Sequence, residues 1–116
     1  MQAVEKYLEA LRAHDWSKLR ATLAPDVERF GPYNDDYRGR DEYASFLEHT
    51  VGALDGYELL VDRVAGDGRV VLVELSETVD DRDGRRLRTD EAVVFDLAGD
   101  GLISRVAVYL RASRHL

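Results

Sequence analysis

Residues 69–97 read RVVLVELSETVDDRDGRRLRTDEAVVFDL, two runs rich in valine and leucine that flank the step Asp83-Gly84. An Asp-Gly step between such runs predicts a β-hairpin, because both residues tolerate the positive φ of a tight turn. The same step recurs at Asp67-Gly68 and Asp100-Gly101. The repeated hairpin signal indicates an antiparallel meander. Its predicted strands cover residues 57–65, 69–79, 86–97 and 102–110.

The first half of the chain has a helical pattern. A first amphipathic helix is predicted by apolar residues at i, i+3, i+4 and i+7, which are Val4, Tyr7, Leu8 and Leu11. Asp15 is placed to cap a short second helix, which Pro25 stops. Residues 27–30 suggest a short strand and residues 31–39 a loop rich in turn formers. A third helix is expected over residues 41–54.

Helices followed by a meander predict an α+β fold in one domain, residues 1–116, with about three helices covering a strongly curved antiparallel sheet. Both faces of this sheet carry apolar residues. The inner face would hold Val71, Val73, Leu75, Val93, Phe95, Val106, Val108 and Leu110. The outer face would hold Leu72, Ala92, Val94, Ala107 and Tyr109. One layer of helices covers one face only, so we expect a homodimer through the outer face.

Composition narrows the classes of function. The 116 residues include 16 Lys and Arg against 23 Asp and Glu, a formal net charge of −7. This balance argues against binding to nucleic acid or to anionic lipid. The absence of cysteine excludes disulfides, thiolate metal sites and thiol nucleophiles. No apolar run reaches the ~20 residues of a membrane span, and no signal peptide is recognisable, so a cytoplasmic location is expected.

Several local strings resemble the nuclear transport factor 2-like superfamily, which includes ketosteroid isomerase, limonene epoxide hydrolase and SnoaL-type polyketide cyclases. These strings are VEKYLEALRAHD at 4–15, LAPDV at 23–27, YRGRD at 37–41 and GDGLI at 99–103. The resemblance covers nearly the whole chain. It implies a cone-shaped fold whose sheet and helices enclose an apolar pocket for a small hydrophobic ligand. Any acid–base chemistry on that ligand would need no metal or cofactor.

The resemblance transfers the functional residues of the isomerases only in part. Tyr7 matches their oxyanion tyrosine. Their general-base aspartate falls on Gly31, and their second oxyanion donor falls on or near Val93. Because two of three catalytic groups are absent, we expect no ketosteroid isomerization by that mechanism. The aspartate that epoxide hydrolases and polyketide cyclases carry on the last strand is also missing from residues 106–109, which read VAVY.

Three residues remain as catalytic candidates. Tyr7 lies on the buried stripe of the first helix, where its hydroxyl either enters the pocket or bonds a backbone carbonyl. Glu77 and Glu91 fall on the inner face if strand alternation holds. Either carboxyl group could be a general base with a raised pKa. Alternatively, both lie beyond the buried zone and reach water or pair with Arg86 or Arg88.

The remaining candidates would line the pocket as ligand-binding residues. They are Trp16, Phe30, Tyr33, Tyr37, Phe46, Val93, Phe95, Val108 and Leu110. Tyr33 and Tyr37 would rim it from the loop, whose Asp35 and Asp36 suggest a solvated turn. The histidines show no metal-ligand spacing, so no metal site is expected. Two functions stay open: acid–base chemistry of isomerase, cyclase or hydrolase type, and a non-catalytic dimeric binding or scaffold module.

Overall fold

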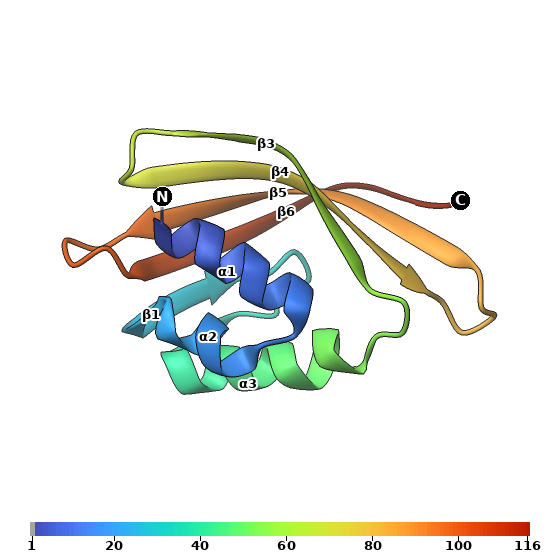
Figure 1. The fold of residues 1–116 in the computed structure, drawn as a ribbon, viewed down its shortest axis with the longest axis horizontal. Coiled ribbons are helices and arrows are strands. Elements are labelled where there is room, and N and C mark those ends of the chain that lie inside the picture. Colours follow the sequence, from blue (N-terminus) through green and yellow to red (C-terminus); the bar gives the residue numbers. More distant parts are fainter. Residues whose placement is uncertain (1) are drawn as a thin grey trace.

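In the computed structural model, residues 2–116 form three α-helices, one short 3-10 helix and six β-strands (Figure 1). The helices are α1 (Gln2–Ala13), α2 (Trp16–Ala21) and α3 (Arg40–Thr50), and the 3-10 helix η1 (Val51–Ala53) follows α3. The strands are β1 (Leu23–Phe30), β2 (Tyr37–Arg38), β3 (Glu58–Gly66), β4 (Val70–Asp80), β5 (Arg86–Leu97) and β6 (Ile103–His115). The α+β class and the four-strand meander are confirmed.

One mixed sheet holds all six strands, in the order β2-β1-β6-β5-β4-β3. The meander from β3 to β6 is antiparallel throughout. However, β1 runs parallel to β6, with Leu23 opposite Ile103 and Phe30 opposite Ala107. The prediction of a purely antiparallel sheet is wrong at this pair. Strand direction was inferred from hairpins, and no hairpin joins β1 to β6, since α3 and the meander lie between them.

The helices cover one face of the sheet, with α1 lying across the strands and α3 beneath α2 (Figure 1). Asp15 caps α2 as predicted, because its side chain accepts a hydrogen bond from the Lys18 amide. The core forms where α1 and α3 meet the inner face, and Val4, Tyr43, Val73 and Phe95 are almost fully buried there.

Irregular pairing interrupts the sheet at several places, and two of them lie in the meander next to Leu75 and Glu91. A register shift lies between Val61 and Arg63 where β3 pairs with β4, and another lies between Asp90 and Glu91 where β5 pairs with β6. Extra residues of this kind bend a strand and increase its twist. The meander is therefore curved, and room remains between its inner face and α3.

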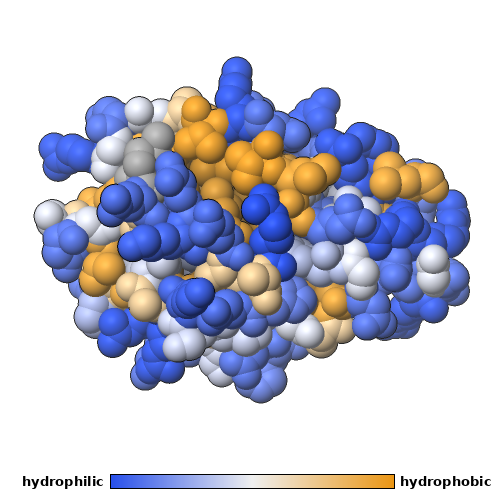
Figure 2. Space-filling view, viewed as in Figure 1, coloured by the Kyte–Doolittle hydropathy of each residue, from blue (hydrophilic) through white to orange (hydrophobic). Residues whose placement is uncertain are grey.

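The outer face of the sheet has no covering layer. Leu60, Leu72 and Tyr109 lie there, and their exposed fractions are 56%, 36% and 56%. In the space-filling view, apolar surface gathers along the upper side of the molecule, over the edge of the sheet (Figure 2). Within residues 2–116, no helix has the length and apolar character needed to cross a membrane.

Candidate active site

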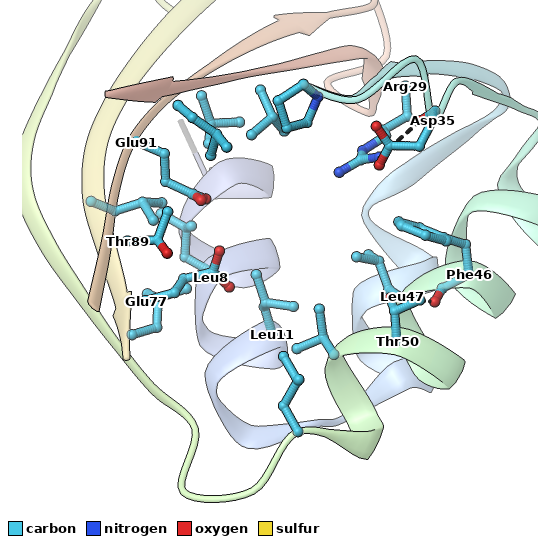
Figure 3. A pocket seen from close by; sticks show the side chains of 18 of the residues that line it. Leu8, Leu11, Arg29, Asp35, Phe46, Leu47, Thr50, Glu77, Thr89 and Glu91 are labelled. Atoms are coloured by element: carbon cyan, nitrogen blue, oxygen red, sulfur yellow. Dashed lines mark hydrogen bonds and ion pairs between the residues drawn. The ribbon is translucent and has the colours of Figure 1, made fainter. Parts of the chain in front are cut away.

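A cavity of about 260 Å³ lies between the curled inner face of the sheet and the helices α1 and α3 (Figure 3). Most of its wall is apolar. The polar side chains on the wall are Tyr7, Arg29, Tyr33, Asp35, Tyr43, Thr50, Tyr57, Glu77, Thr89 and Glu91. Figure 3 shows Glu77, Thr89 and Glu91 on one side of the cavity, and Arg29 with Asp35 on the other. The polar groups thus form two separate clusters across an apolar space.

The first cluster is a pair of carboxyl groups on neighbouring strands. Glu77 on β4 lies opposite Thr89 on β5, and Leu75 lies opposite Glu91, so the two glutamates are diagonal neighbours on the inner face. The Tyr57 hydroxyl donates a hydrogen bond to the Glu77 carboxylate. Burial, followed by the negative charge of Glu77, raises the pKa of Glu91 to about 9. Glu91 is therefore a neutral acid at pH 7.

This geometry decides between the two alternatives for the glutamates. Arg86 pairs with Asp80 and Glu58. Arg88 pairs with Asp90 on the outer face. Neither arginine contacts Glu77 or Glu91 within residues 2–116, and both glutamates reach the cavity instead. The inward direction follows from the strand alternation, which the register shift beside Glu91 leaves intact on β5.

The second cluster begins with two phenols. The hydroxyls of Tyr7 on α1 and Tyr43 on α3 share a hydrogen bond, and both residues are almost fully buried. Burial raises the pKa of Tyr43 to about 12 and that of Tyr7 well above its ordinary value. Both phenols are therefore neutral at pH 7. One of them donates to the other, which leaves one phenolic hydrogen for another acceptor.

The partner of the Tyr7 hydroxyl is thus a side chain, not the backbone carbonyl that was one alternative. Tyr43 was not among the site candidates from the sequence, and its role at the cavity was missed. A signal for it did exist. Two tyrosines on facing apolar stripes each need a hydrogen-bond partner for a buried hydroxyl, and each can serve the other.

An ion pair completes the second cluster. The Nη1 group of Arg29 on β1 donates to the Asp35 carboxylate over 2.6 Å and to the Asp35 carbonyl over 2.9 Å. The Arg29 guanidinium carbon lies 4.9 Å from the centre of the Phe46 ring. Burial favours a higher pKa for Asp35, but the hydrogen bonds from Arg29 and the Tyr33 amide outweigh it and lower that pKa. Both groups of the pair are therefore charged at neutral pH.

The ion pair was not foreseen. Asp35 was expected in a solvated turn, but three quarters of its side chain is covered, with 25% exposed. The ion pair also explains why residue 31 has no side chain. A Cβ atom at residue 31 would overlap the Asp35 carboxylate and the Arg29 guanidinium. The ion pair therefore fills the space beside Gly31.

The structure brings most of the expected ligand-binding residues to the cavity, but not all. Those on its wall are Tyr33, Phe46, Val93, Phe95, Val108 and Leu110. Trp16 stacks on His14 outside it, and Phe30 lies beneath the Arg105 guanidinium. Tyr37 packs on the far side of Phe46, with ring centres 4.2 Å apart. Within residues 2–116, no three His, Asp or Glu side chains gather as metal ligands would.

Comparison with known families supports the reading of the fold. A family model described as the SnoaL-like domain matches residues 4–106. The chain belongs to the SnoaL-like domain family. No curated protein matches this SnoaL-like chain at a significant level. The match of the family model over residues 4–106 therefore confirms the expected superfamily and its SnoaL-like branch.

Solved structures place this SnoaL-like domain among proteins of the same architecture. A Kribbella flavida DSM 17836 protein with a provisional ketosteroid isomerase assignment is 27% identical, with a TM-score of 0.82, over 96% of this chain and 76% of its own. An epoxide hydrolase of the LEH-like type from M. tuberculosis is also 27% identical, with a TM-score of 0.81, over 95% and 80%. RV0760c from Mycobacterium tuberculosis, solved with estradiol-17beta-hemisuccinate, is 15% identical with a TM-score of 0.80, over 97% and 95%. This last likeness concerns the fold alone.

Proposed function

We propose that this SnoaL-like protein binds a small, mostly apolar molecule in its cavity and transfers a proton on it, with Glu91 as the acid. The observation that carries the proposal is the position of Glu77 and Glu91. Two carboxyl groups face an apolar cavity that the hydrogen-bonded phenols of Tyr7 and Tyr43 also line. Buried carboxyl pairs are costly, and they occur where a proton must be held and released.

The chemistry follows from the protonation states. Glu91 carries a proton at pH 7 and is positioned to donate it to a basic atom of the ligand as a general acid. The negative charge of Glu77 stabilises the protonated form of Glu91 beforehand. The phenol pair would donate its one remaining hydrogen to a ligand oxygen on which negative charge develops. Such a pairing suits isomerase, cyclase or hydrolase chemistry, and an isomerase and an epoxide hydrolase are named among the similar structures.

The test compares Glu91→Gln with Glu74→Gln. Glu74 also lies on the meander but faces outward and pairs with Arg63, so its variant repeats the chemical change outside the cavity. One-ring ketones, lactones, acids and epoxides are first screened for a rise in melting temperature. Compounds that bind are then incubated in D₂O and followed by NMR for deuterium uptake or product.

We expect Glu91→Gln to retain binding and to lower turnover by roughly 100-fold or more, the usual contribution of a positioned acid. Glu74→Gln should match the original protein. Unchanged turnover in Glu91→Gln would show that the carboxyl pair does not perform the chemistry.

A non-catalytic binding module remains the second candidate, and one observation favours it. The positions of two isomerase carboxyl groups hold Gly31 and Val93, and an ion pair occupies the space beside Gly31. Compounds that bind without any turnover or deuterium uptake would support this candidate over the enzyme.

We also propose that the protein is a homodimer through the outer face of its sheet and acts in the cytoplasm. Support for the dimer comes from the exposed apolar residues Leu60, Leu72 and Tyr109 on a face that no helix covers. Removing such a face from water is favourable in proportion to its apolar area. A second copy presents the same surface and is the simplest complement.

A further inference from the structure

The donor cluster around Arg29 has more hydrogen-bond donors than acceptors. Only Nη1 of Arg29 has hydrogen bonds within residues 2–116, both to Asp35. Its Nε atom is buried without a partner in the same part of the chain, and the guanidinium also interacts with the Tyr43 hydroxyl. The Tyr7 and Tyr43 pair adds one unused phenolic hydrogen. Buried donors without partners are costly, so this cluster lacks an acceptor.

The nearest carboxylate, Asp35, reaches only the Nη1 group of Arg29 within residues 2–116. One oxygen of Asp35 accepts from Arg29 Nη1 and the other from the Tyr33 amide. Asp35 also belongs to the loop between β1 and β2, so it neutralises Arg29 from the outer side. Figure 3 shows the guanidinium of Arg29 extending from this pair toward the open space of the cavity. The free edge of the guanidinium is thus the edge that a ligand would meet.

We propose that the ligand carries a carboxylate, which Arg29 and the phenols of Tyr7 and Tyr43 bind at the end of the cavity opposite Glu91. This inference rests on the proposed function, whose substrate class it narrows. An ionised carboxylate accepts at about four positions and donates at none, which matches the donor surplus of the cluster. Guanidinium and carboxylate groups also form the strongest hydrogen bonds available to side chains.

The size of the cavity limits the rest of the ligand. A volume of about 260 Å³ corresponds to about nine groups of the size of a water molecule, at ~30 Å³ each. A one-ring acid such as benzoate or cyclohexanecarboxylate fits within this space. The ring would contact the apolar wall, where Leu11, Leu47 and Val93 lie. The far end of the ring then faces Glu91, the group that transfers the proton.

The experiment uses matched pairs of compounds that differ only in charge. Benzoate is compared with benzamide, and cyclohexanecarboxylate with cyclohexanecarboxamide, by calorimetric titration or by NMR shifts of the protein. For the original protein we expect each acid to bind at least about tenfold more tightly than its amide, a difference of about 1.4 kcal/mol. Equal affinity for acid and amide would overturn the proposal.

Variants test which side chain provides the preference. Arg29→Met should bring the ratio of acid to amide affinity close to one. Arg38→Met is the control, because the Arg38 side chain is 82% exposed and pairs with Glu28 outside the cavity. It should keep the original ratio. An unchanged ratio in Arg29→Met would refute the role of Arg29. If circular dichroism shows that this variant is unfolded, Tyr43→Phe decides, since it removes one donor without removing charge and should lower the ratio several-fold.

Failure of this inference is distinguishable from failure of the proposed function. Glu91→Gln should keep the preference for the acid, since Glu91 lies on the opposite wall. Amides that bind as well as acids would refute the carboxylate and leave the binding cavity standing. If neither these compounds nor neutral one-ring molecules bind at all, both proposals fail.

Discussion

At the scale of single residues, burial in the cavity wall changes the protonation or the hydrogen-bond partners of several side chains. Glu91 is a buried acid that keeps its proton, and the Tyr7 and Tyr43 phenols keep theirs. Arg29 stays charged although its side chain is only 9% exposed, because Asp35 compensates it. Each state has a measurable consequence for stability, because a proton bound differently in the folded and unfolded chains makes unfolding depend on pH.

For Glu91 the sign of that dependence can be worked out. Its folded pKa of about 9 lies above the unfolded value of about 4.5, so the folded state binds more protons than the unfolded state between these limits. The contribution of Glu91 to the free energy of unfolding is therefore complete below about pH 4.5 and is lost as the pH rises toward 9.

This predicts a change in the pH dependence of urea unfolding. The free energy of unfolding should fall between pH 5.5 and pH 8.5 in the original protein, and Glu91→Gln should remove much of that fall because glutamine does not titrate. Glu74→Gln, on the outer face, should retain it. If Glu91→Gln shows the same pH dependence as the original protein, Glu91 does not hold a proton in the folded state.

At the scale of elements, the loop between β1 and β2 controls the donor end of the cavity. It carries Gly31, Tyr33 and Asp35. Asp35 accepts hydrogen bonds from Arg29, and the Tyr33 amide donates to the Asp35 carboxylate and holds it in place. The space left by the missing side chain at Gly31 is what allows Asp35 to reach Arg29. The loop is thus a structural part of the site although it belongs to no helix or strand.

Gly31→Ala tests this role. The added methyl group would overlap the ion pair, so we expect a loss of about 1–3 kcal/mol in the free energy of unfolding, as for overpacked sites. Gly99→Ala is the matched control, because no atom lies within 4 Å of its added Cβ. Its stability should stay within about 0.5 kcal/mol of the original. Chemical denaturation of both variants gives the comparison, and equal stabilities would contradict the role given to Gly31.

Elements with a local signal were the predictable part of this protein. The Asp-Gly steps located the hairpins of the meander, and alternation along β4 and β5 placed Glu77 and Glu91 on the inner face. The parallel pairing of β1 with β6 has no local signal, because a long stretch of chain separates the two strands. Arg29 and Asp35 were missed for a related reason: a charged residue on a strand or in a loop is usually solvated, and only the tertiary structure covers these two.

At the scale of the whole molecule, the uncovered outer face predicts the state of assembly. We expect a dimer of twice 13.1 kDa in sedimentation at micromolar concentration. Val94→Lys should dissociate it, because Val94 lies on the outer face between Leu72 and Ala107, where a buried unpaired charge is expensive.

The control for the dimer is Val64→Lys. Val64 is 43% exposed at the sheet edge, and its partner Val73 places it on the inner side. This variant should remain a dimer. A monomeric original protein, or a Val94→Lys variant that stays dimeric, would show that the outer face is not the interface.

The parallel pairing of β1 with β6 also bears on the order in which the site forms. The carboxyl groups lie on a hairpin of neighbouring strands and can meet early, since their pairing needs only a short loop. Arg29 is fixed beside Val106, a residue much later in the chain. A nascent chain emerging from the ribosome would therefore contain the acid pair before the guanidinium has its place. Closing that long loop carries the larger entropic cost, so binding competence should be the final event of folding and should arrive together with β6.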